Sequence, residues 1–468
     1  LVFMRAGAVV ATRSYPETVP GTRREKAAPK GMRRTPLFGL VRVEDDPDYQ
    51  EYRDVDPEPA PATDTLTEAE VVRLESGLRA QGLRPLGWRI EDDEAAVAVS
   101  DDHKRRPART AGRAARALTD TVPGDVNWLG VTMIEDGVRL SHVRVLRRDV
   151  DAGLGRAGSP EEIWLNTALD TGSATAARGG WTAFDRRYPV FTWALYPEIR
   201  QHFGSGSDGG YRAQAYMTVA GELEVARGLS LSAALTRDIA GNLDGVPARA
   251  AGPRVRSDIA RYVDEGKTAI GRATVDYTLR AMDDVYLRLS AGLFEPMYGG
   301  AGIEALYRPQ GQDYAVGVDV NRVRQRDFDQ LLGFRDYEAW TGHVRVYRDW
   351  SHLGLEAVVE AGRYLAGDWG GGMDVYRRFD NGVRFGAWFA VTDMPRSVFG
   401  RDRFAKGLYL TIPLDLVLPF SLRRDWGLEA RALNRDGGQS LDRGPGLYEL
   451  TRPGTERAIH GDWRNFLD

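Results

Sequence analysis

The sequence predicts a mainly β protein: an antiparallel β-barrel of the membrane-spanning kind, preceded by a small α+β domain. Three observations support this fold class. From about residue 186, apolar and polar residues alternate in segments of about ten residues, the period and length of barrel strands. Connections between these segments tend to alternate short and long, as in barrels with tight turns on one side of a membrane. Before residue 150, helical spacing alternates with strand pairs.

Composition limits the alternatives. Lys and Arg total 63 against 67 Asp and Glu, so the near-balanced charge predicts no nucleic-acid partner. No run of eighteen apolar residues occurs, which excludes a transmembrane helix but leaves barrel strands possible, because alternation hides their apolar half. Cysteine is absent, so disulfides, thiolate nucleophiles and cysteine-ligated metals are excluded.

The composition of residues 1–62 predicts a polar N-terminal segment that ends in a linker. They are basic at first and finish with the proline-rich "DVDPEPAPA". The apolar run 6–11 is too short for a signal peptide, so we expect the chain to be a fragment or to have a misassigned start.

Residues 63–150 predict the α+β domain. Thr67 with Glu70 form a capping box before a helix that ends at Gly82. A hairpin turning at residues 92–93, a second helix over about 106–118 and a second strand pair complete an αββαββ order. Residues 151–185 are a connecting segment.

Residues 186–468 predict the barrel. We expect about 14 strands, with 12 to 16 acceptable, because bacterial single-chain barrels usually have an even number. The strand candidates are 190–201, 211–221, 227–236, 272–280, 285–294, 301–308, 313–321, 341–348, 353–362, 372–379, 383–392, 406–413 and 426–433.

The connections predict an orientation. If the α+β domain is periplasmic, the tight turns "AMDD", "PQGQ", "DWSH" and "DNG" lie on the periplasmic side. The long connections 237–271, 322–340, 393–405 and 434–446 then lie outside the cell. A soluble all-β sandwich, which also has one apolar and one polar face, is the alternative.

Alternation assigns side chains to the two faces of the wall. The polar positions Arg280, Arg288, Glu356, Glu360 and Arg384 are predicted to line the lumen. Tryptophans and tyrosines are expected mostly in aromatic girdles at the membrane interfaces: Trp193, Tyr196, Tyr307, Trp340, Trp350, Trp369 and Trp388.

The stretch "RQRDFDQLLGFRDYE" (324–338) is the candidate functional loop. Its acid pairs are the residues a glycosidase would need, which leaves a polysaccharide-modifying enzyme as an alternative function. The interleaved arginines would instead pair with the acids and lower their pKa. We therefore predict a loop that binds the polymer or gates the barrel, formed by Arg326, Asp327, Asp329, Arg335, Asp336 and Glu338.

Other motifs give weak indications of catalysis. "LDTGS" (169–173) matches an aspartic-protease loop, but no second copy occurs in the sequence. The six histidines form no zinc-type spacing. We expect no enzyme activity, no metal and no cofactor.

Several long strings resemble the YjbH family, including its GfcD-like members. They include "YGGAGIEALYRP", "YAVGVDVNRVRQRDFDQLLGFRDYE", "RRFDNGVRFGAWFAVTD" and "GLYLTIPLDL", and the resemblance covers roughly residues 125–460. It implies an outer-membrane barrel that takes part in exopolysaccharide or capsule biosynthesis and secretion. It also implies periplasmic or lipoprotein partners. Family members are typically longer, with an upstream β-rich part of which residues 1–62 would be a remnant.

The expected function is therefore that of an outer-membrane barrel acting as a conduit or anchor for exopolysaccharide. Its expected contacts are the polymer, outer-membrane lipid and components of the same secretion system. A structural scaffold or adhesin with a plugged barrel is the further alternative. An open, conducting lumen would favour the conduit over this scaffold.

Overall fold

The structure of the chain, a computed structural model, describes residues 65–101, 106–124, 126–171, 180–185, 188–204, 210–247, 254–350, 353–379, 381–395, 404–413, 416, 425–433 and 435–468. It also gives the backbone of four short strands near the N-terminus: β1 (Val2–Arg5), β2 (Ala8–Thr12), β3 (Met32–Thr35) and β4 (Gly39–Arg42). Apart from these strands, the predicted linker region 1–62 lies outside the described residues.

The first unit has the predicted αββαββ order. Its elements are α1 (Glu68–Ala80), β5 (Leu83–Glu91), β6 (Glu94–Asp101), α2 (Pro107–Thr119), β7 (Trp128–Glu135) and β8 (Val138–Leu146). Thr67 and Glu70 form the predicted capping box at the start of α1. Strands β6 and β7 pair in parallel, whereas the two hairpins are antiparallel.

Four further elements complete this unit: α3 (Arg147–Leu154), α4 (Pro160–Leu165), β9 (Ala168–Asp170) and β10 (Thr182–Ala183). They extend the sheet to the order β10-β5-β6-β7-β8-β9. The core lies between the sheet and its helices, and it includes Ile459, Trp463 and Phe466 from the end of the chain. Among the described residues, no helix is long and apolar enough to span a membrane.

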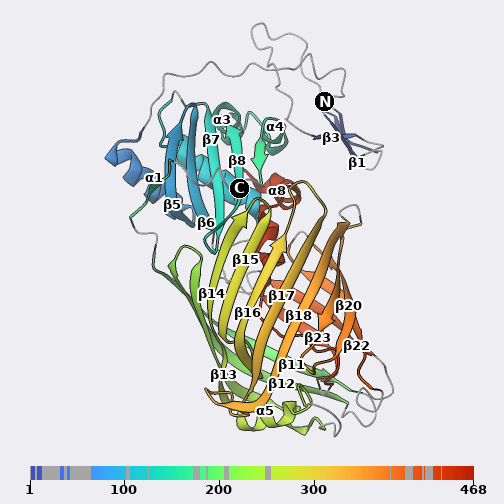
Figure 1. The fold of residues 1–468 in the computed structure, drawn as a ribbon. Coiled ribbons are helices and arrows are strands. Elements are labelled where there is room, and N and C mark those ends of the chain that lie inside the picture. Colours follow the sequence, from blue (N-terminus) through green and yellow to red (C-terminus); the bar gives the residue numbers. More distant parts are fainter. Residues whose placement is uncertain are drawn as a thin grey trace.

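The second unit is an antiparallel sheet of thirteen strands curled into a barrel (Figure 1). Every strand candidate from the sequence overlaps one of them, although several candidates extend past the observed ends, and the count in the described part falls within the expected 12 to 16. The strands are β11 (Val190–Phe203), β12 (Tyr211–Ala226), β13 (Leu229–Gly241), β14 (Thr268–Met282), β15 (Val285–Leu293), β16 (Tyr298–Tyr307), β17 (Tyr314–Arg326), β18 (Phe334–Trp350), β19 (Leu355–Arg363), β20 (Trp369–Arg378), β21 (Arg384–Thr392), β22 (Phe404–Pro413) and β23 (Asp425–Ala430).

The odd strand number makes the closing edge parallel. The first and last strands of an antiparallel sheet of thirteen run in the same direction, and β11 lies beside β23. The Phe203 N–H donates to the Arg431 carbonyl at 2.8 Å across this edge. Because β23 is much shorter than β11, the barrel is nearly rather than fully closed.

The outer surface of the barrel is apolar, and the inner surface is polar. On β18, Trp340 and Val344 are 55% and 50% exposed, while the intervening Thr341 and His343 are each only 3% exposed. Such a wall is the inverse of a water-soluble barrel, whose apolar side chains point inward.

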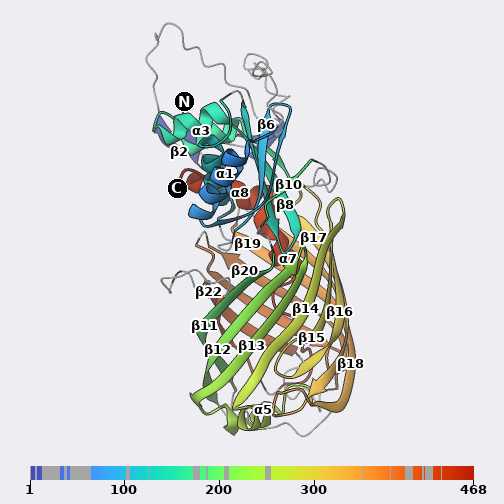
Figure 2. The ribbon, with the colours of Figure 1, turned by 90° about the vertical axis from the view of Figure 1, so that its left-hand side faces the viewer.

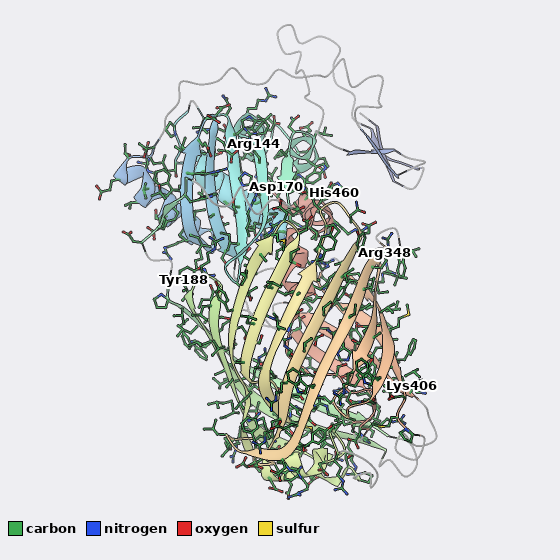
Figure 3. The ribbon with its side chains drawn as sticks, in the orientation of Figure 1. Arg144, Asp170, Tyr188, Arg348, Lys406 and His460 are labelled. Atoms are coloured by element: carbon green, nitrogen blue, oxygen red, sulfur yellow. The ribbon has the colours of Figure 1, made fainter. Side chains whose placement is uncertain are left out.

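Aromatic and cationic side chains lie near both ends of this apolar surface. Trp193 and Tyr307 are exposed near the domain end, and Trp340 and Trp369 are exposed toward the far end, as a pair of girdles requires. Arg348 and Lys406 lie on the outer face toward the domain end and the far end respectively (Figure 3). Trp388 and Tyr196 depart from the predicted girdle, because Trp388 lines a cavity inside the barrel and Tyr196 packs against the buried Ala194 on the inner face.

The far end of the barrel is capped by the long connection between β13 and β14. It contains η5 (Leu243–Gly245) and α5 (Ile259–Glu265), and α5 lies beneath the barrel opening in both views (Figures 1 and 2). Tyr262 and Val263 join a buried apolar cluster with Phe294 and Tyr298 from the wall side. This end therefore has its own small hydrophobic core.

The C-terminal residues correct the predicted barrel range 186–468. The last strand ends at Ala430, and the chain finishes with α7 (Leu447–Thr451), η7 (Arg452–Gly454), α8 (Glu456–Asp462) and η8 (Trp463–Asn465). Helix α7 lies at the domain end of the barrel, and α8 lies beside the α+β domain (Figure 2). Phe466, which would sit near the end of a terminal barrel strand, is instead buried in the domain core.

Candidate functional site

The five predicted lumen residues all lie on the polar inner face, and most of them contact the chain's own C-terminal segment. Arg288 donates to the Pro445 carbonyl at 2.7 Å and pairs with Glu304 at 2.6 Å. Glu356 and Arg384 pair with arginine and glutamate of that segment. Glu360 pairs with Arg345 on the next strand.

Arg280 lies at the domain end of the wall. Its guanidinium donates to the carbonyls of Arg139 and Thr171, both in the α+β domain. It therefore joins the barrel to the domain rather than lining open space.

After β23 the chain turns back and runs through the lumen from the far end toward the domain. At the far end the Asp436 carboxylate accepts three N–H bonds, from Val255, Arg256 and Ser257 of the cap, at 2.8–2.9 Å. Further along, Arg443 donates to the Ser290 hydroxyl at 3.0 Å, and Arg272 donates to the Arg443 carbonyl at 2.6 Å. We call residues 435–454 the plug.

Helix α7 fills the domain end of the lumen with one aromatic stack and several polar contacts. The rings of Tyr448 and Tyr347 stack at 4.1 Å with an interplanar angle of 6°. Arg308 lies 4.0 Å from the Tyr448 ring centroid and donates to its carbonyl at 2.9 Å. Glu304 accepts the Leu447 N–H at 2.8 Å, which satisfies one of the free amides at the start of this short helix.

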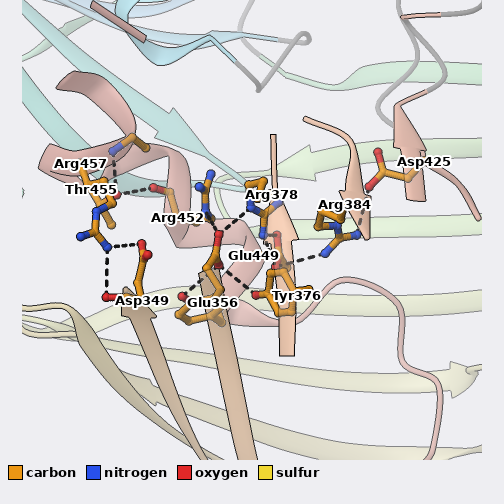
Figure 4. Close-up of polar contacts among 12 residues, drawn as sticks. Asp349, Glu356, Tyr376, Arg378, Arg384, Asp425, Glu449, Arg452, Thr455 and Arg457 are labelled. Atoms are coloured by element: carbon orange, nitrogen blue, oxygen red, sulfur yellow. Dashed lines mark hydrogen bonds and ion pairs between the residues drawn. The ribbon is translucent and has the colours of Figure 1, made fainter. Parts of the chain in front are cut away.

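An ion-pair network holds α7 and η7 against β19, β20 and β21 (Figure 4). Glu449 pairs with Arg378 at 2.9 Å and with Arg384 at 3.3 Å. Glu356 pairs with Arg378 at 2.8 Å and with Arg452 of the plug at 3.3 Å. Within the lumen, removing one member of such a network leaves its partners with unmatched charge, so the plug is held specifically.

Beyond the plug, the chain is anchored in the α+β domain. The Trp463 indole N–H donates to the Pro160 carbonyl at 2.6 Å, and Phe466 is buried against α2. Asp462 accepts N–H bonds from Ala108 and Arg109 at the first turn of α2, where a carboxylate is favourable. One continuous segment therefore ties the far-end cap, the lumen and the domain together.

The predicted gating loop 326–338 is divided by the structure. Arg326 is fully buried at the end of β17, where its guanidinium donates to the carbonyls of Ile270, Glu295, Gln330 and Leu331. The prediction that it contacts polymer is therefore wrong, because four backbone acceptors enclose it. The true loop is the short turn 327–333, since β18 already begins at Phe334.

The remaining loop candidates do not form one site. Asp329 accepts the Leu331 N–H within the turn, and Asp327 lies beside Gly333. Arg335 lies 4.2 Å from the Phe328 ring centroid and 3.5 Å from an Asp258 oxygen, so it belongs to the cap.

Asp336 and Glu338 lie on the outer surface instead. There they pair with Arg324 at 3.6 Å and with Arg322 at 3.1 Å, respectively. The predicted ion pairing of the acids is thus present, but on the outside of the wall. Over the described ranges, no cluster of three or more His, Cys, Asp or Glu side chains is placed to hold a metal.

Sequence reasoning missed the plug. The stretch 434–446, "NRDGGQSLDRGPG", has neither strand alternation nor helical spacing. The sequence therefore predicts an external connection there. A usable signal lies in the rest of the C-terminal sequence, where helices start after Gly446 and Thr455 and strand alternation does not return.

The chain has relatives among known proteins. Residues 34–453 match the YjbH family, described as "Exopolysaccharide biosynthesis protein YbjH". The chain belongs to this family. The "Uncharacterized lipoprotein YjbH" of Escherichia coli (strain K12) is 32% identical over 272 residues, which are 56% of this chain and 38% of that protein. The chain thus spans well under two thirds of this YjbH relative.

A solved structure, Salmonella typhi OmpF in complex with daunomycin, aligns with a TM-score of 0.24 and 13% sequence identity. The alignment covers 47% of this chain and 84% of that chain.

Proposed function

We propose that this YjbH-family chain is an outer-membrane barrel that takes part in exopolysaccharide production and secretion, with its lumen held closed by the plug. The observation that carries the proposal is the inverted wall, apolar outside and polar inside, around a segment of the chain's own C-terminus. An apolar surface with aromatic residues near both ends fits a bilayer. The α+β domain would then lie in the periplasm, where the family's periplasmic or lipoprotein partners are available.

The plug distinguishes two versions of this role. A conduit requires the plug to leave the lumen, because it crosses the barrel from the cap to the domain. An anchor or scaffold requires it to stay. Burial of Phe466 and Trp463 in the domain core favours a closed resting state, and we propose that the polymer passes only when the domain releases the plug.

Conductance in planar lipid bilayers tests the closed state. We expect the wild-type chain to show no steady opening. Replacing Arg378 and Arg384 by glutamine removes both partners of Glu449, so we expect conducting events to appear. The matched control is Arg322→Gln, which removes an arginine of the outer surface.

An engineered disulfide provides the opposite test. A Cβ built on Gly438 lies 3.6 Å from the Ala405 Cβ, within the ~3.5–4.5 Å span of disulfides. The chain has no other cysteine. Gly438 has φ +66°, which costs about 1–2 kcal/mol for another residue. When Ala405→Cys and Gly438→Cys are added to the Arg378→Gln/Arg384→Gln protein, oxidation should abolish its conducting events, and reduction should restore them.

A wild-type protein with large steady conductance would contradict the closed state.

The role in exopolysaccharide production is tested in cells. Deleting the gene should lower polymer at the cell surface, and restoring the gene should return it. Unchanged polymer in the deletion strain would contradict the proposed role, whatever the conductance experiments give.

We also propose that the acidic residues near the far end have no catalytic role. Asp327→Asn and Asp329→Asn variants should fold and support secretion like the wild type. Loss of a saccharide-cleaving activity in these variants, with normal folding, would favour the enzyme alternative instead.

A further inference from the structure

A cavity of about 350 Å³ lies inside the barrel between the plug and the wall formed by β18 to β21. Gly438, Gln439 and Ser440 of the plug form one side of it. The size falls within the ~300–1,000 Å³ of small-molecule sites in proteins. An occupant would touch the wall and the plug together.

The lining combines aromatic surface with hydrogen-bonding groups of both kinds. Trp388 lines the cavity, and its indole N–H donates to Glu429 at 2.9 Å, which fixes the orientation of the ring. Gln439 and Ser440 add an amide and a hydroxyl. An aromatic ring beside polar side chains suits a ligand whose rings carry both C–H faces and hydroxyl groups, as sugars do.

The formal charges of the described lining residues balance. Two arginines, Arg345 and Arg431, face two carboxylates, Glu360 and Asp374. Both arginines already have acidic partners: Arg345 pairs with Asp319 and with Glu360, and Arg431 pairs with Glu429 at 3.1 Å. Among the described residues of the lining, each cation therefore already has an acidic partner in the protein.

Asp374 has hydrogen-bonding capacity to spare. Among the described residues, its carboxylate accepts only from the Tyr409 hydroxyl, at 3.0 and 3.1 Å, and has no cation within salt-bridge distance. A carboxylate has about four lone-pair positions, so it can accept further hydroxyl donors. It would repel a second carboxylate.

We infer that this cavity binds a segment of a neutral, hydroxyl-rich saccharide. Trp388 is the stacking surface, and Asp374 is the acceptor for sugar hydroxyls. The inference rests on the proposed function and names the class of polymer handled inside the lumen. Because the plug forms part of the site, the same sugar segment contacts the element that closes the barrel.

The test is binding to the full chain in a detergent without a sugar headgroup, measured by titration calorimetry and saturation-transfer NMR. The probes are short neutral oligosaccharides of glucose, galactose, mannose and N-acetylglucosamine, with oligogalacturonate as the acidic counterpart. We expect at least one neutral probe to bind and oligogalacturonate not to bind. Asp374→Asn and Trp388→Ala should each weaken binding by about tenfold or more.

Trp340→Ala is the matched control, because it removes a tryptophan from the outer surface. Heat-modifiable migration on gels verifies that each variant is folded. The inference is overturned if no neutral probe binds, if oligogalacturonate binds as well as the neutral probes, or if folded Asp374→Asn and Trp388→Ala proteins bind like the control. Sugar binding without any effect of gene deletion on surface polymer would refute the proposed function and leave the site in place.

Discussion

Arg326 shows how a charged residue in a predicted loop becomes a structural one. Its guanidinium is fully buried and gathers carbonyls from β14 and from the connections after β15 and β17. Arginine has five donors in a planar fork, so it satisfies acceptors from several directions at once. The Tyr262 hydroxyl donates to its carbonyl at 2.6 Å, which links the same residue to α5.

We predict that Arg326→Met destabilises the far-end cap. The variant removes the shared donor of four backbone carbonyls, of which the Gln330 carbonyl keeps the N–H bond from Ile270. Each buried carbonyl left unsatisfied costs about 1–3 kcal/mol. Amide exchange of α5 should become faster, while exchange in the α+β domain stays unchanged. Arg322→Met, on the outer surface, serves as the control. Equal exchange of α5 in both variants would show that Arg326 does not hold the cap.

Glu94 gives a prediction about pH in the α+β domain. Burial alone would raise its pKa, but the hydrogen bond from His142 at 3.0 Å and the charges of His142, Arg144 and Arg89 hold the pKa below 4.5. A lowered folded-state pKa stabilises the fold above the unfolded value, and this stabilisation is lost as the pH falls through the folded value.

We therefore expect Glu94→Gln to lower domain stability by about 2 kcal/mol at pH 7, since hydrogen bonds to charged groups contribute about that much. The difference from the wild type should shrink as the pH falls below about 4.5. Pulse proteolysis of the full chain in urea measures it. A difference that stays constant from pH 7 to pH 3 would rule out ionised Glu94 as its source.

At the scale of elements, α2 depends on a glycine to receive the end of the chain. A Cβ on Gly112 would lie 1.6 Å from the Phe466 carbonyl oxygen, whereas a Cβ on Gly77 of α1 meets only the Ala117 Cβ at 3.7 Å. The two glycines are otherwise matched, since each lies inside a helix of thirteen residues.

Gly112→Ala should therefore release the C-terminus from the domain, and Gly77→Ala should not. Losing the buried Phe466 contacts should lower the free energy of unfolding of the domain by about 3–5 kcal/mol, as a large-to-small substitution in a core does. Trypsin cleavage after Arg457 and Arg464 should accelerate only in Gly112→Ala, and the bilayer conductance of that variant should rise. Protected arginines in folded Gly112→Ala would contradict this docking.

The elements differ in how well the sequence predicts them. Alternation is a local property of the chain, so each strand candidate overlaps an observed strand, although β18 begins seven residues earlier than expected. The capping box at Thr67 is equally local. Burial of Arg326 and the path of residues 435–454 arise from contacts between distant segments, for which the chain has no local pattern.

The whole molecule joins two units that the sequence presents as separate. The α+β domain lacks part of its core without Ile459, Trp463 and Phe466, and these residues follow the plug directly in the chain. The plug residues themselves are held on the wall by ion pairs and one tyrosine stack. The domain and the plug should therefore open together, whereas the hydrogen-bonded strands remain closed.

Native-state amide exchange measures this coupling. We predict that α2 and α8 exchange with the same opening free energy under increasing urea, because α8 is part of the domain core, and that α7 opens with them. Strands β15 to β18 should stay protected at urea concentrations where those helices exchange. The oxidised Ala405→Cys/Gly438→Cys protein is the control, since it retains the plug on the wall when the domain opens. In the protein without the engineered disulfide, α7 could instead stay as protected as the strands. The wall rather than the domain would then hold the plug, and opening of the domain could not release it.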